Sequence, residues 1–329
     1  MTMGQTEPTP GMDFTQASTL LTQIKARLND RLLGQESIVD EVLIALISGG
    51  HILIEGVPGL GKTLLVQLLS GCIRGQYKRI QFTPDLMPAD ITGHAIYDMN
   101  DNRFRLRTGP VFTNLLLADE INRAPAKTQA ALLEAMQERQ VTIEGTTHRM
   151  PTPFMVLATQ NPIEQEGTYP LPEAELDRFL LKSLISYPEH SHEVAMAKRV
   201  TTHVDGQSST ADDEGIVTPE DMLAIQKVAA DIAIDDAVVE YAVNLVRETR
   251  QSVMLSRGAG PRGSIALLRA ARAHALLRGA AFVLPDDVKR MAPSVLRHRI
   301  HVSADMEIEG INADIVLARI MDSVDAPRT

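Results

Sequence analysis

A glycine-rich loop that ends in lysine and threonine constrains this 329-residue chain more than any other stretch. Residues 56–63, Gly-Val-Pro-Gly-Leu-Gly-Lys-Thr, match the pattern G-x-x-x-x-G-K-[ST] at every fixed position. An apolar run of strand length, residues 50–55, precedes the loop, and residues 64–70 follow it as a predicted buried helix that Gly71 closes. In this setting backbone N–H groups and a helix N-terminus surround a phosphate. The stretch therefore predicts a nucleotide site.

The loop pattern predicts roles for nine consecutive residues. Lys62 should reach the outer phosphates of the nucleotide, and the Thr63 hydroxyl should bind Mg²⁺. A glycine-rich turn with a solvated lysine is the alternative, but it leaves the flanking strand and helix unexplained. We predict that these residues contact the nucleotide: Gly56, Val57, Pro58, Gly59, Leu60, Gly61, Lys62, Thr63 and Leu64.

Two acidic residues follow a second apolar run of strand length. Leu115 to Ala118 lead directly into Asp119 and Glu120. Ligands collect at the carboxyl ends of the strands of an open parallel sheet, and a near-continuous apolar run is typical of such a strand. We predict that Asp119 holds Mg²⁺ through water and that Glu120 orients or deprotonates the water that attacks the γ-phosphate. The alternative for this pair is a helix cap.

A third buried strand is predicted over residues 154–159, and Asn161 follows it. An amide side chain beside the two carboxylates can hold the attacking water or sense the γ-phosphate. The alternative is an asparagine that forms a turn before Pro162. We favour the first interpretation because the preceding strand places Asn161 at the same sheet edge.

The pattern of elements predicts a parallel-sheet α/β core followed by a smaller all-α domain. Strand-like runs stop near residue 188, and helical periods follow. We predict a mobile tail over residues 1–13, the nucleotide-binding core over 14–186 and the helical lid over 187–329. Two β-hairpins are predicted as inserts in the core, at 93–108 and 140–150. Helix starts are predicted at Ser37, Thr218, Asp235, Ser264 and Pro285.

Composition restricts the class of protein. Apolar residues make up 44% of the chain and aromatic residues only 4%, so the core must be aliphatic. A net charge of −10 argues against a surface built mainly for nucleic acid. The single cysteine, Cys72, excludes an intramolecular disulfide and a cysteine zinc cage, and fits a reducing compartment. With no apolar run long enough to span a membrane and no signal peptide, we expect a cytoplasmic protein.

The order of these features resembles that of the AAA+ ATPases. Three runs narrow the resemblance to the MoxR family: Asp-Glu-Ile-Asn-Arg-Ala-Pro at 119–125, the stretch 158–174, and Leu-Asp-Arg-Phe at 176–179. The resemblance covers about residues 15–325. It implies a P-loop AAA+ core with hairpin inserts and a small helical lid, and it implies ATP as the nucleotide.

The resemblance also implies site roles. Residues 56–63 would be the Walker A loop, Asp119 and Glu120 the Walker B pair, and Asn161 the sensor-1 residue. Arg178 would be an arginine finger that reaches the ATP of the neighbouring subunit; the alternative is a local ion pair with Asp177.

A fourth motif places an arginine in the lid. Gly260-Pro261-Arg262-Gly263 resembles the family's lid motif, so Arg262 would be the sensor-2 arginine that reports the nucleotide to the lid. The family usually has Ser before the proline and Ala after the arginine, so the setting of Arg262 differs slightly.

Members of the family form rings, usually hexamers. The resemblance therefore implies a homo-oligomer that acts as a chaperone-like ATPase on a protein client, in complex maturation or metal-cofactor insertion. A protein with a von Willebrand factor A domain is the implied partner. Membrane insertion is not expected.

Three other functions remain open alternatives. The first is the motor subunit of a metal chelatase. The second is a nucleic-acid motor or loader, for which Arg103, Arg105 and Arg107 would share one face of a strand, although the acidic composition weighs against it. The third is a nucleotide-gated binding module that hardly turns over.

Two smaller hypotheses concern charged residues. Gln81, at the end of a predicted strand, could restrain Glu120 until a partner binds, whereas Arg123 receives no role. The runs at 190–192 and 297–301 contain histidines but lack the spacing of a zinc site, so we assign them to solvated faces.

Overall fold

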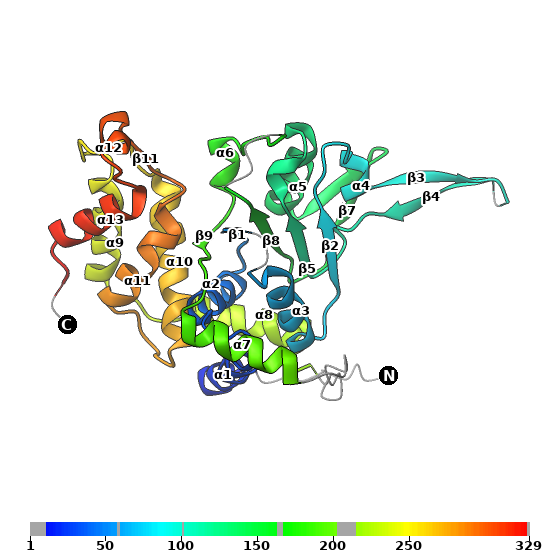
Figure 1. Cartoon of the computed structure of the whole chain (residues 1–329). Helices are drawn as coiled ribbons and strands as arrows, with labels where there is room; N and C mark the ends of the chain where they lie inside the picture. Colours follow the sequence, from blue (N-terminus) through cyan, green and yellow to red (C-terminus); the bar gives the residue numbers. More distant parts are fainter. Residues whose placement is uncertain (1–10, 58–59, 101, 163–166, 203–214, 328–329) are drawn as a thin grey trace, which may run out of the picture.

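A five-stranded parallel sheet lies at the centre of the first part of the chain (Figure 1). The computed structural model describes residues 11–57, 60–100, 102–162, 167–202 and 215–327. Neighbouring strands follow the order β2-β5-β8-β1-β9, and all four pairs are parallel. The strands are β1 (Ile52–Glu55), β2 (Tyr77–Gln81), β5 (Leu115–Asp119), β8 (Met155–Gln160) and β9 (Leu181–Leu184).

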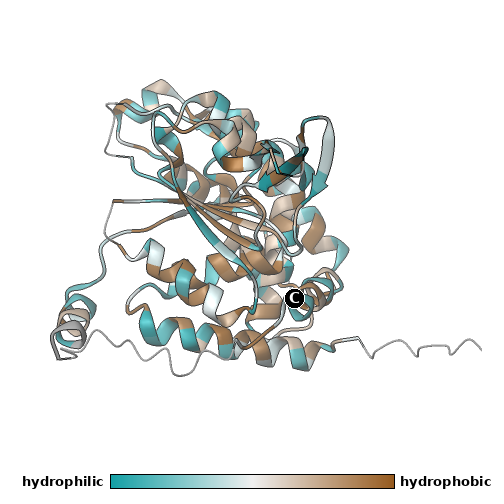
Figure 2. Cartoon of the chain, turned by 90° about the vertical axis from the view of Figure 1, so that its right-hand side faces the viewer, coloured by the Kyte–Doolittle hydropathy of each residue, from teal (hydrophilic) through white to brown (hydrophobic). Residues whose placement is uncertain are grey.

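Both faces of the sheet are covered, which explains why its central strands are apolar throughout. Along β5, Leu115 and Leu117 belong to one hydrophobic cluster, whereas Leu116 and Ala118 belong to another. Successive side chains of a strand point to opposite faces, so each cluster marks one covered face. Figure 2 shows the resulting apolar interior.

Helices supply the two covering layers of the sheet. The first cluster includes buried residues of α1, α2 and α3, and the second includes those of α4 and α5. The helices and the single 3₁₀ turn of this part are α1 (Phe14–Arg31), α2 (Glu36–Ile47), α3 (Lys62–Cys72), α4 (Pro88–Thr92), η1 (Ile121–Arg123), α5 (Ala126–Glu138), α6 (Glu173–Leu176) and α7 (His190–Thr202).

Some predicted helix ends are wrong by a few residues. Gln35 rather than Ser37 precedes α2, and Gly71 lies inside α3, which continues to Cys72. Of the predicted tail, residues 1–10 lie outside the described part, while Asp13 caps α1 by accepting a hydrogen bond from the Gln16 N–H. The carboxylate thus satisfies one of the free N–H groups of the first turn.

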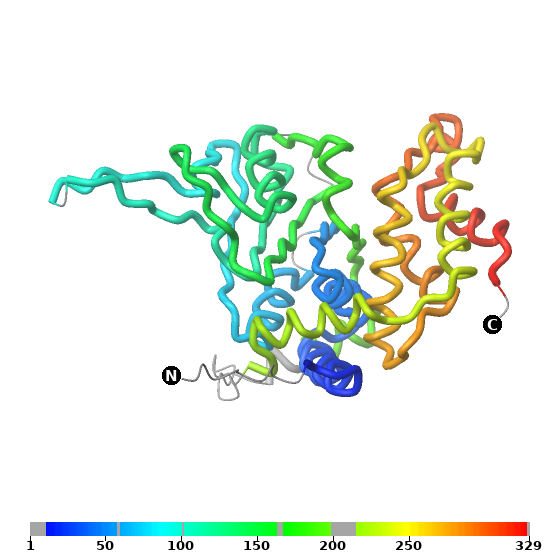
Figure 3. Tube along the Cα trace, turned by 180° about the vertical axis from the view of Figure 1, so that it is seen from behind, coloured from blue at the N-terminus to red at the C-terminus, as the bar shows by residue number. Residues whose placement is uncertain are grey.

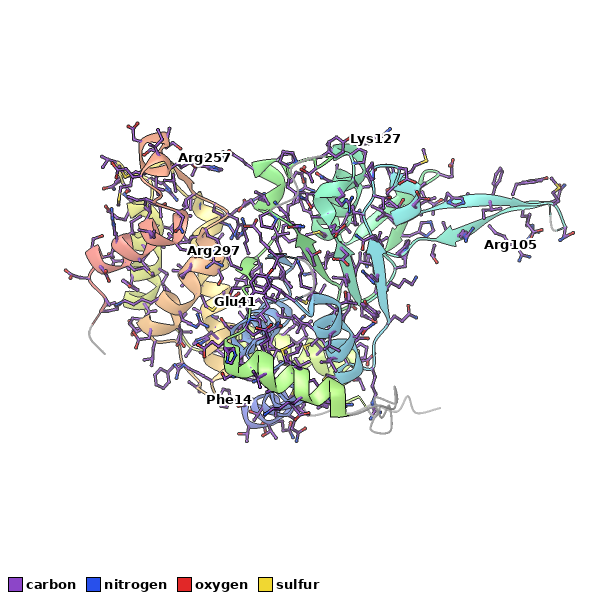
Figure 4. All side chains as sticks on the ribbon, in the orientation of Figure 1. Phe14, Glu41, Arg105, Lys127, Arg257 and Arg297 are labelled. Atoms are coloured by element: carbon purple, nitrogen blue, oxygen red, sulfur yellow. The ribbon has the colours of Figure 1, made fainter. Side chains whose placement is uncertain are left out.

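The two predicted hairpins are present. β3 (Gly93–Asp98) pairs with β4 (Arg103–Thr108), and β6 (Gln140–Ile143) pairs with β7 (Thr146–Arg149). The first hairpin extends far from the sheet, and Arg105 lies along it (Figures 3 and 4). Its outer position leaves the side chains of β4 exposed.

Most of the remaining elements form the helical part beside the sheet, whereas α8 (Pro219–Ala230) lies below the sheet against α1 and α2 (Figure 1). The predicted caps at Thr218 and Asp235 are confirmed, but Ser264 is buried inside its helix, which starts after Gly260. One short antiparallel strand pair, which the sequence analysis missed, accompanies these helices. The elements are α8 (Pro219–Ala230), α9 (Asp236–Glu248), β10 (Leu255–Arg257), α10 (Pro261–Leu277), α11 (Pro285–Leu296), β11 (His301–Val302), α12 (Ala304–Ile308) and α13 (Ala313–Ser323).

A buried carboxylate joins the two parts. Glu41 of α2 accepts hydrogen bonds from Ser183 of β9 and Ser294 of α11 (Figure 4). Glu41 is 8% exposed, so these hydroxyl groups replace the water it has lost. None of the helices in the described ranges combines the length and the apolar character that crossing a bilayer requires.

The assignment of residues 297–301 to a solvated face is wrong for its central part. His298 is 6% exposed and Arg299 is 9% exposed. Both follow α11 and bind backbone carbonyl groups of the first part of the chain, which the sequence alone could not indicate.

Candidate nucleotide site

The glycine loop lies at the carboxyl end of β1 and leads into α3, as predicted. Gly61 has φ +74° and forms the N-cap of α3, a backbone conformation that glycine adopts without strain. Gly56 packs against Ile185, the residue that follows β9: a Cβ at Gly56 would lie 2.5 Å from the Ile185 carbonyl oxygen. Both glycines are thus required by geometry. Two further residues of the predicted loop, Pro58 and Gly59, lie outside the described residues.

Lys62 lies folded over the loop. Its Nζ donates a hydrogen bond to the Gly56 carbonyl oxygen at 2.7 Å. Burial lowers the pKa of this ammonium group, and the charges of Asp119 and Glu120 act in the opposite direction. Gln35 supports the loop from the other side by donating to the Leu60 carbonyl oxygen at 2.9 Å.

One cavity of about 530 Å³ collects most of the predicted site residues. The loop end, the two carboxylates and the predicted sensor line it together, because β1, β5 and β8 are neighbours in the sheet. Its lining residues are Gly61, Lys62, Thr63, Leu64, Gln67, Arg79, Gln81, Asp119, Glu120 and Asn161.

Asp119 ends β5 with both carboxylate oxygens engaged. Thr159 of β8 donates its hydroxyl hydrogen to Oδ1 at 2.6 Å, and Arg79 of β2 donates from Nη2 to Oδ2 at 2.6 Å. Strands on either side of β5 therefore fix the orientation of this carboxylate. The Thr159 oxygen also accepts a hydrogen bond from the Glu120 N–H at 2.9 Å, which ties the two acidic residues together.

Glu120 has a left-handed backbone, with φ 56° and ψ 49°. This conformation is uncommon for a glutamate, and such strain concentrates at functional sites. Its Oε2 accepts hydrogen bonds from Gln81 Nε2 at 2.7 Å and from Arg123 Nη1 at 3.1 Å. The predicted contact between Gln81 and Glu120 is therefore present.

The donor set of the cavity fits Mg²⁺. Thr63 offers a hydroxyl oxygen and Asp119 a carboxylate oxygen on the same cavity wall. Magnesium prefers oxygen ligands and usually keeps several waters, so one or two protein ligands beside nucleotide phosphates suffice. These two residues are the ones that would hold the ion.

The two predicted arginines of the site do not line this cavity. Arg178 and Arg262 instead lie around a second cavity of about 350 Å³ between the sheet part and α10. Arg178 pairs with Glu175 at 3.0 Å, and Arg262 lies 3.5 Å from Asp177. The alternative considered for Arg178 is a local ion pair with Asp177, and the structure shows a pairing with Glu175 instead.

Sequence reasoning missed three residues of the first cavity. Arg79 and Gln67 line it, and Thr159 binds the carboxylate of Asp119. Thr159 carried a usable signal, since it is a polar residue near the end of an apolar strand. Arg79 carried none, because its role depends on the pairing of β2 with β5, which brings Gln81 beside Asp119.

Comparisons with known proteins agree with this geometry. The model of the ATPase family associated with various cellular activities (AAA) matches residues 51–181, and an AAA lid domain model matches residues 247–320. The chain is 45% identical over 308 residues to Chaperone MoxR1 of Mycobacterium tuberculosis, which covers 90% of this chain and 80% of that protein. The chain belongs to the MoxR family of AAA+ ATPases.

Two further comparisons place other proteins near this MoxR-family chain. It is 44% identical to protein YeaC of Bacillus subtilis over 94% of this chain and 95% of that protein. A crystal structure of a candidate ATPase from Cytophaga hutchinsonii matches it with a TM-score of 0.88 and 39% identity, covering 96% and 97% of the two chains. The α/β AAA+ fold with a helical lid is therefore established, and nucleotide binding follows from the family.

Proposed function

We propose that this protein hydrolyses ATP to ADP and phosphate at the subunit interfaces of a ring. One observation carries the proposal: the phosphate loop, both carboxylates and Asn161 line one cavity, whereas Arg178 and Arg262 line another. A site divided in this way is complete only when a second subunit brings its arginines to the first. The AAA+ family generally forms oligomeric rings, which supply such an interface.

Each residue of the first cavity has a proposed task. Lys62 and the loop amides bind the phosphates, and Glu120 orients the attacking water and accepts its proton. Asn161 holds that water from the next strand. Mg²⁺, held by Thr63 and Asp119, would neutralise phosphate charge.

The hydrogen bonds of the two carboxylates suggest that both are restrained in the subunit before hydrolysis begins. Gln81 and Arg123 bind the oxygen of Glu120 that would accept the proton, and Arg79 binds Asp119. We propose that Gln81 must release Glu120 before hydrolysis, so that partner binding can control the rate.

Arg178 is proposed to act in trans on the nucleotide of the next subunit. Such an arginine stabilises the charge of the transition state and is worth about 10³ to 10⁵ in rate. The side chains of Arg178 and Glu175 are 24% and 22% exposed, so water still reaches their ion pair, and we propose that Arg178 exchanges this partner for a phosphate.

The biological role that we propose is chaperone-like remodelling or maturation of protein complexes in the cytoplasm, including metal-cofactor insertion. The name of Chaperone MoxR1 supports the first part of this role. A partner with a von Willebrand factor A domain and a hexameric ring remain expectations from the family.

The test is ATP hydrolysis against protein concentration, with molecular mass measured in parallel by light scattering. For wild type we expect the rate per subunit to rise as a ring assembles. Arg178→Ala should assemble and bind nucleotide but lose this rise. An equal rate in the monomer and the assembled protein would exclude an inter-subunit site.

The chelatase motor and the nucleic-acid loader remain alternatives with the same hydrolytic site. Arg103, Arg105 and Arg107 do lie on one strand, β4, but Arg105 pairs with Asp98 at 3.0 Å. Stimulation of hydrolysis by DNA or RNA would favour the loader, whereas no stimulation favours the protein client.

A further inference from the structure

Three consecutive residues of the lid, Arg297-His298-Arg299, bind the segment that carries Arg178. They follow the end of α11, and Arg297 faces the sheet part in Figure 4. The segment they bind, residues 177–182, connects α6 to β9 and includes the first residues of that strand. The lid therefore contacts the chain immediately before and after Arg178.

Arg299 makes the densest set of these contacts. Its Nε lies 2.8 Å from Asp177 Oδ1, its Nη2 donates to the Phe179 carbonyl oxygen at 2.7 Å, and its Nη1 donates to that of Leu180 at 3.1 Å. The side chain is 4% exposed. A guanidinium group presents five donors in a rigid fork, so a single buried arginine can fix several acceptors at once.

The two preceding residues extend the same contact. The His298 Nε2 atom lies 3.1 Å from the Phe179 carbonyl oxygen, which it can bind only as a donor. Arg297 donates from Nη1 to the Lys182 carbonyl oxygen at 2.7 Å and pairs with Asp314 of α13 at 2.9 Å. Carbonyl groups on both sides of Arg178 are thus held by the lid.

The strand that this segment enters, β9, runs beside β1 toward the chain's own phosphate loop. β9 pairs with β1, Lys182 lies 2.9 Å from Glu55, and the Ile185 carbonyl packs against Gly56. Arg178 therefore lies in a short connection that is held in two places: it enters the edge strand β9, and it is bound by Arg299 of the lid.

We propose that Arg299 is a positioning residue for Arg178, which it holds at the subunit face by fixing residues 177–180 to the lid. This inference rests on the proposed action of Arg178 on the neighbouring subunit. It assigns the buried arginine to catalysis in trans, although Arg299 itself touches no substrate. The position of the lid then determines the position of Arg178.

Hydrolysis by two variants, one of them a control, tests the inference. Arg299→Lys keeps the charge beside Asp177 but loses the fork that reaches the carbonyl oxygens. We expect kcat to fall by about tenfold to a hundredfold, since a displacement near 1 Å costs about 10² in rate. Nucleotide affinity and ring mass should stay at the wild-type level. Arg278→Lys is the matched control, because Arg278 binds Asp287 within the lid, and it should retain the wild-type kcat.

Mixed rings separate positioning from a general loss of structure. Lys62→Ala subunits lack a working phosphate loop but keep Arg178 and Arg299. In an equal mixture with Arg299→Lys subunits, half of the subunits have an intact phosphate loop, and half of their neighbours carry Arg299. About one interface in four combines both and should recover hydrolysis. If Arg299 served only its own nucleotide site, the mixture would show no more than the low rate of Arg299→Lys, and the inference would be overturned.

The outcomes also separate this inference from the proposed function. If Arg178→Ala retains the wild-type rate, the proposed action of Arg178 on the neighbouring subunit is wrong. If Arg178→Ala is slow and Arg299→Lys is not, only the positioning role is wrong. Should Arg299→Lys fail to fold, His298→Phe removes the bond to the Phe179 carbonyl while keeping a ring, and we expect the same recovery in mixed rings.

Discussion

At the scale of single residues, the hydrolysis that we propose depends on how Glu120 is held. Its left-handed backbone is fixed by the bond from its N–H to Thr159, and its carboxylate is bound by Gln81 and Arg123. The position of this side chain is therefore determined by three neighbouring elements. Backbone strain of this kind persists only where the surroundings over-determine it.

Replacing the carboxylate should separate binding from hydrolysis. Glu120→Gln keeps the size of the side chain but removes the base, so we expect ATP to bind normally and kcat to fall by about 10² or more. Lys62→Ala is the contrasting variant and should lose nucleotide binding itself. Fluorescent-nucleotide titration and phosphate release measure the two properties. An unchanged rate in Glu120→Gln would remove this residue from catalysis.

Removing the restraint on Glu120 should raise the rate of hydrolysis, whereas removing the carboxylate lowers it. In Gln81→Ala the hydrogen bond at 2.7 Å is lost, so the carboxylate can reach the water more often. A hydrogen bond to a charged group contributes about 1 kcal/mol or more, which corresponds to a rise in basal kcat of about fivefold. Basal phosphate release without a partner is the measurement, and Gln67→Ala, on the same cavity, is the control. A slower variant would contradict the restraint.

At the scale of elements, the sequence predicted the three central strands of the sheet but not the order of the strands. Apolar runs identify β1, β5 and β8, because a strand covered on both faces has no polar side. Nothing in the chain says that β2 pairs with β5, so the contacts of Arg79 with Asp119 could not be foreseen. Thr218 and Asp235 show why helix caps are easier to predict than strand pairing, because a cap depends only on neighbours within one turn.

Long-range contacts were the hardest to predict. His298 and Arg299 have the composition of a surface run, and only the tertiary structure places carbonyl groups beside them. Ser264 gave a misleading signal because a helix can start at a proline, here Pro261, without any side-chain cap.

His51, just before β1, should make the stability of the sheet depend on pH. Its Nδ1 accepts a hydrogen bond from the Val156 N–H at 3.0 Å, and its Nε2 lies 3.2 Å from the Met136 carbonyl oxygen. Burial lowers the pKa of His51 to about 4. In the unfolded chain the pKa of His51 is near 6.5, so below this pH the unfolded chain binds a proton that the folded chain does not yet bind. Stability should therefore fall as the pH drops below about 6.5, and level off below about 4.

Unfolding experiments can isolate this contribution. Between pH 7.5 and pH 5 the free energy of unfolding should decrease by about 2 kcal/mol through His51 alone. Urea unfolding of wild type and His51→Gln at both pH values gives the difference, because glutamine has no proton to gain. Equal pH dependence in the two proteins would show that His51 protonates freely in the folded state.

At the scale of the whole molecule, the residues proposed for the site line two separate cavities. The phosphate loop and the carboxylates line the first cavity, and the arginines line the second, where the lid meets the sheet part. Glu41, which accepts hydrogen bonds from hydroxyl groups of β9 and α11, joins the lid to the sheet. A ring would place the second cavity of one subunit against the first cavity of the next.

The same division predicts on which subunit Arg262 acts. Arg262 is 71% exposed and shares its cavity with Arg178, so we expect it to contact the nucleotide of the neighbouring subunit. Arg262→Ala should lower kcat, and equal mixing with Lys62→Ala subunits should restore hydrolysis at about one interface in four. If Arg262 acted on its own subunit's nucleotide, no interface of the mixture would be complete and hydrolysis would not rise above the low rate of Arg262→Ala. Ring mass, followed by light scattering, must remain unchanged for either result to count, because a failure to assemble would abolish hydrolysis in both cases.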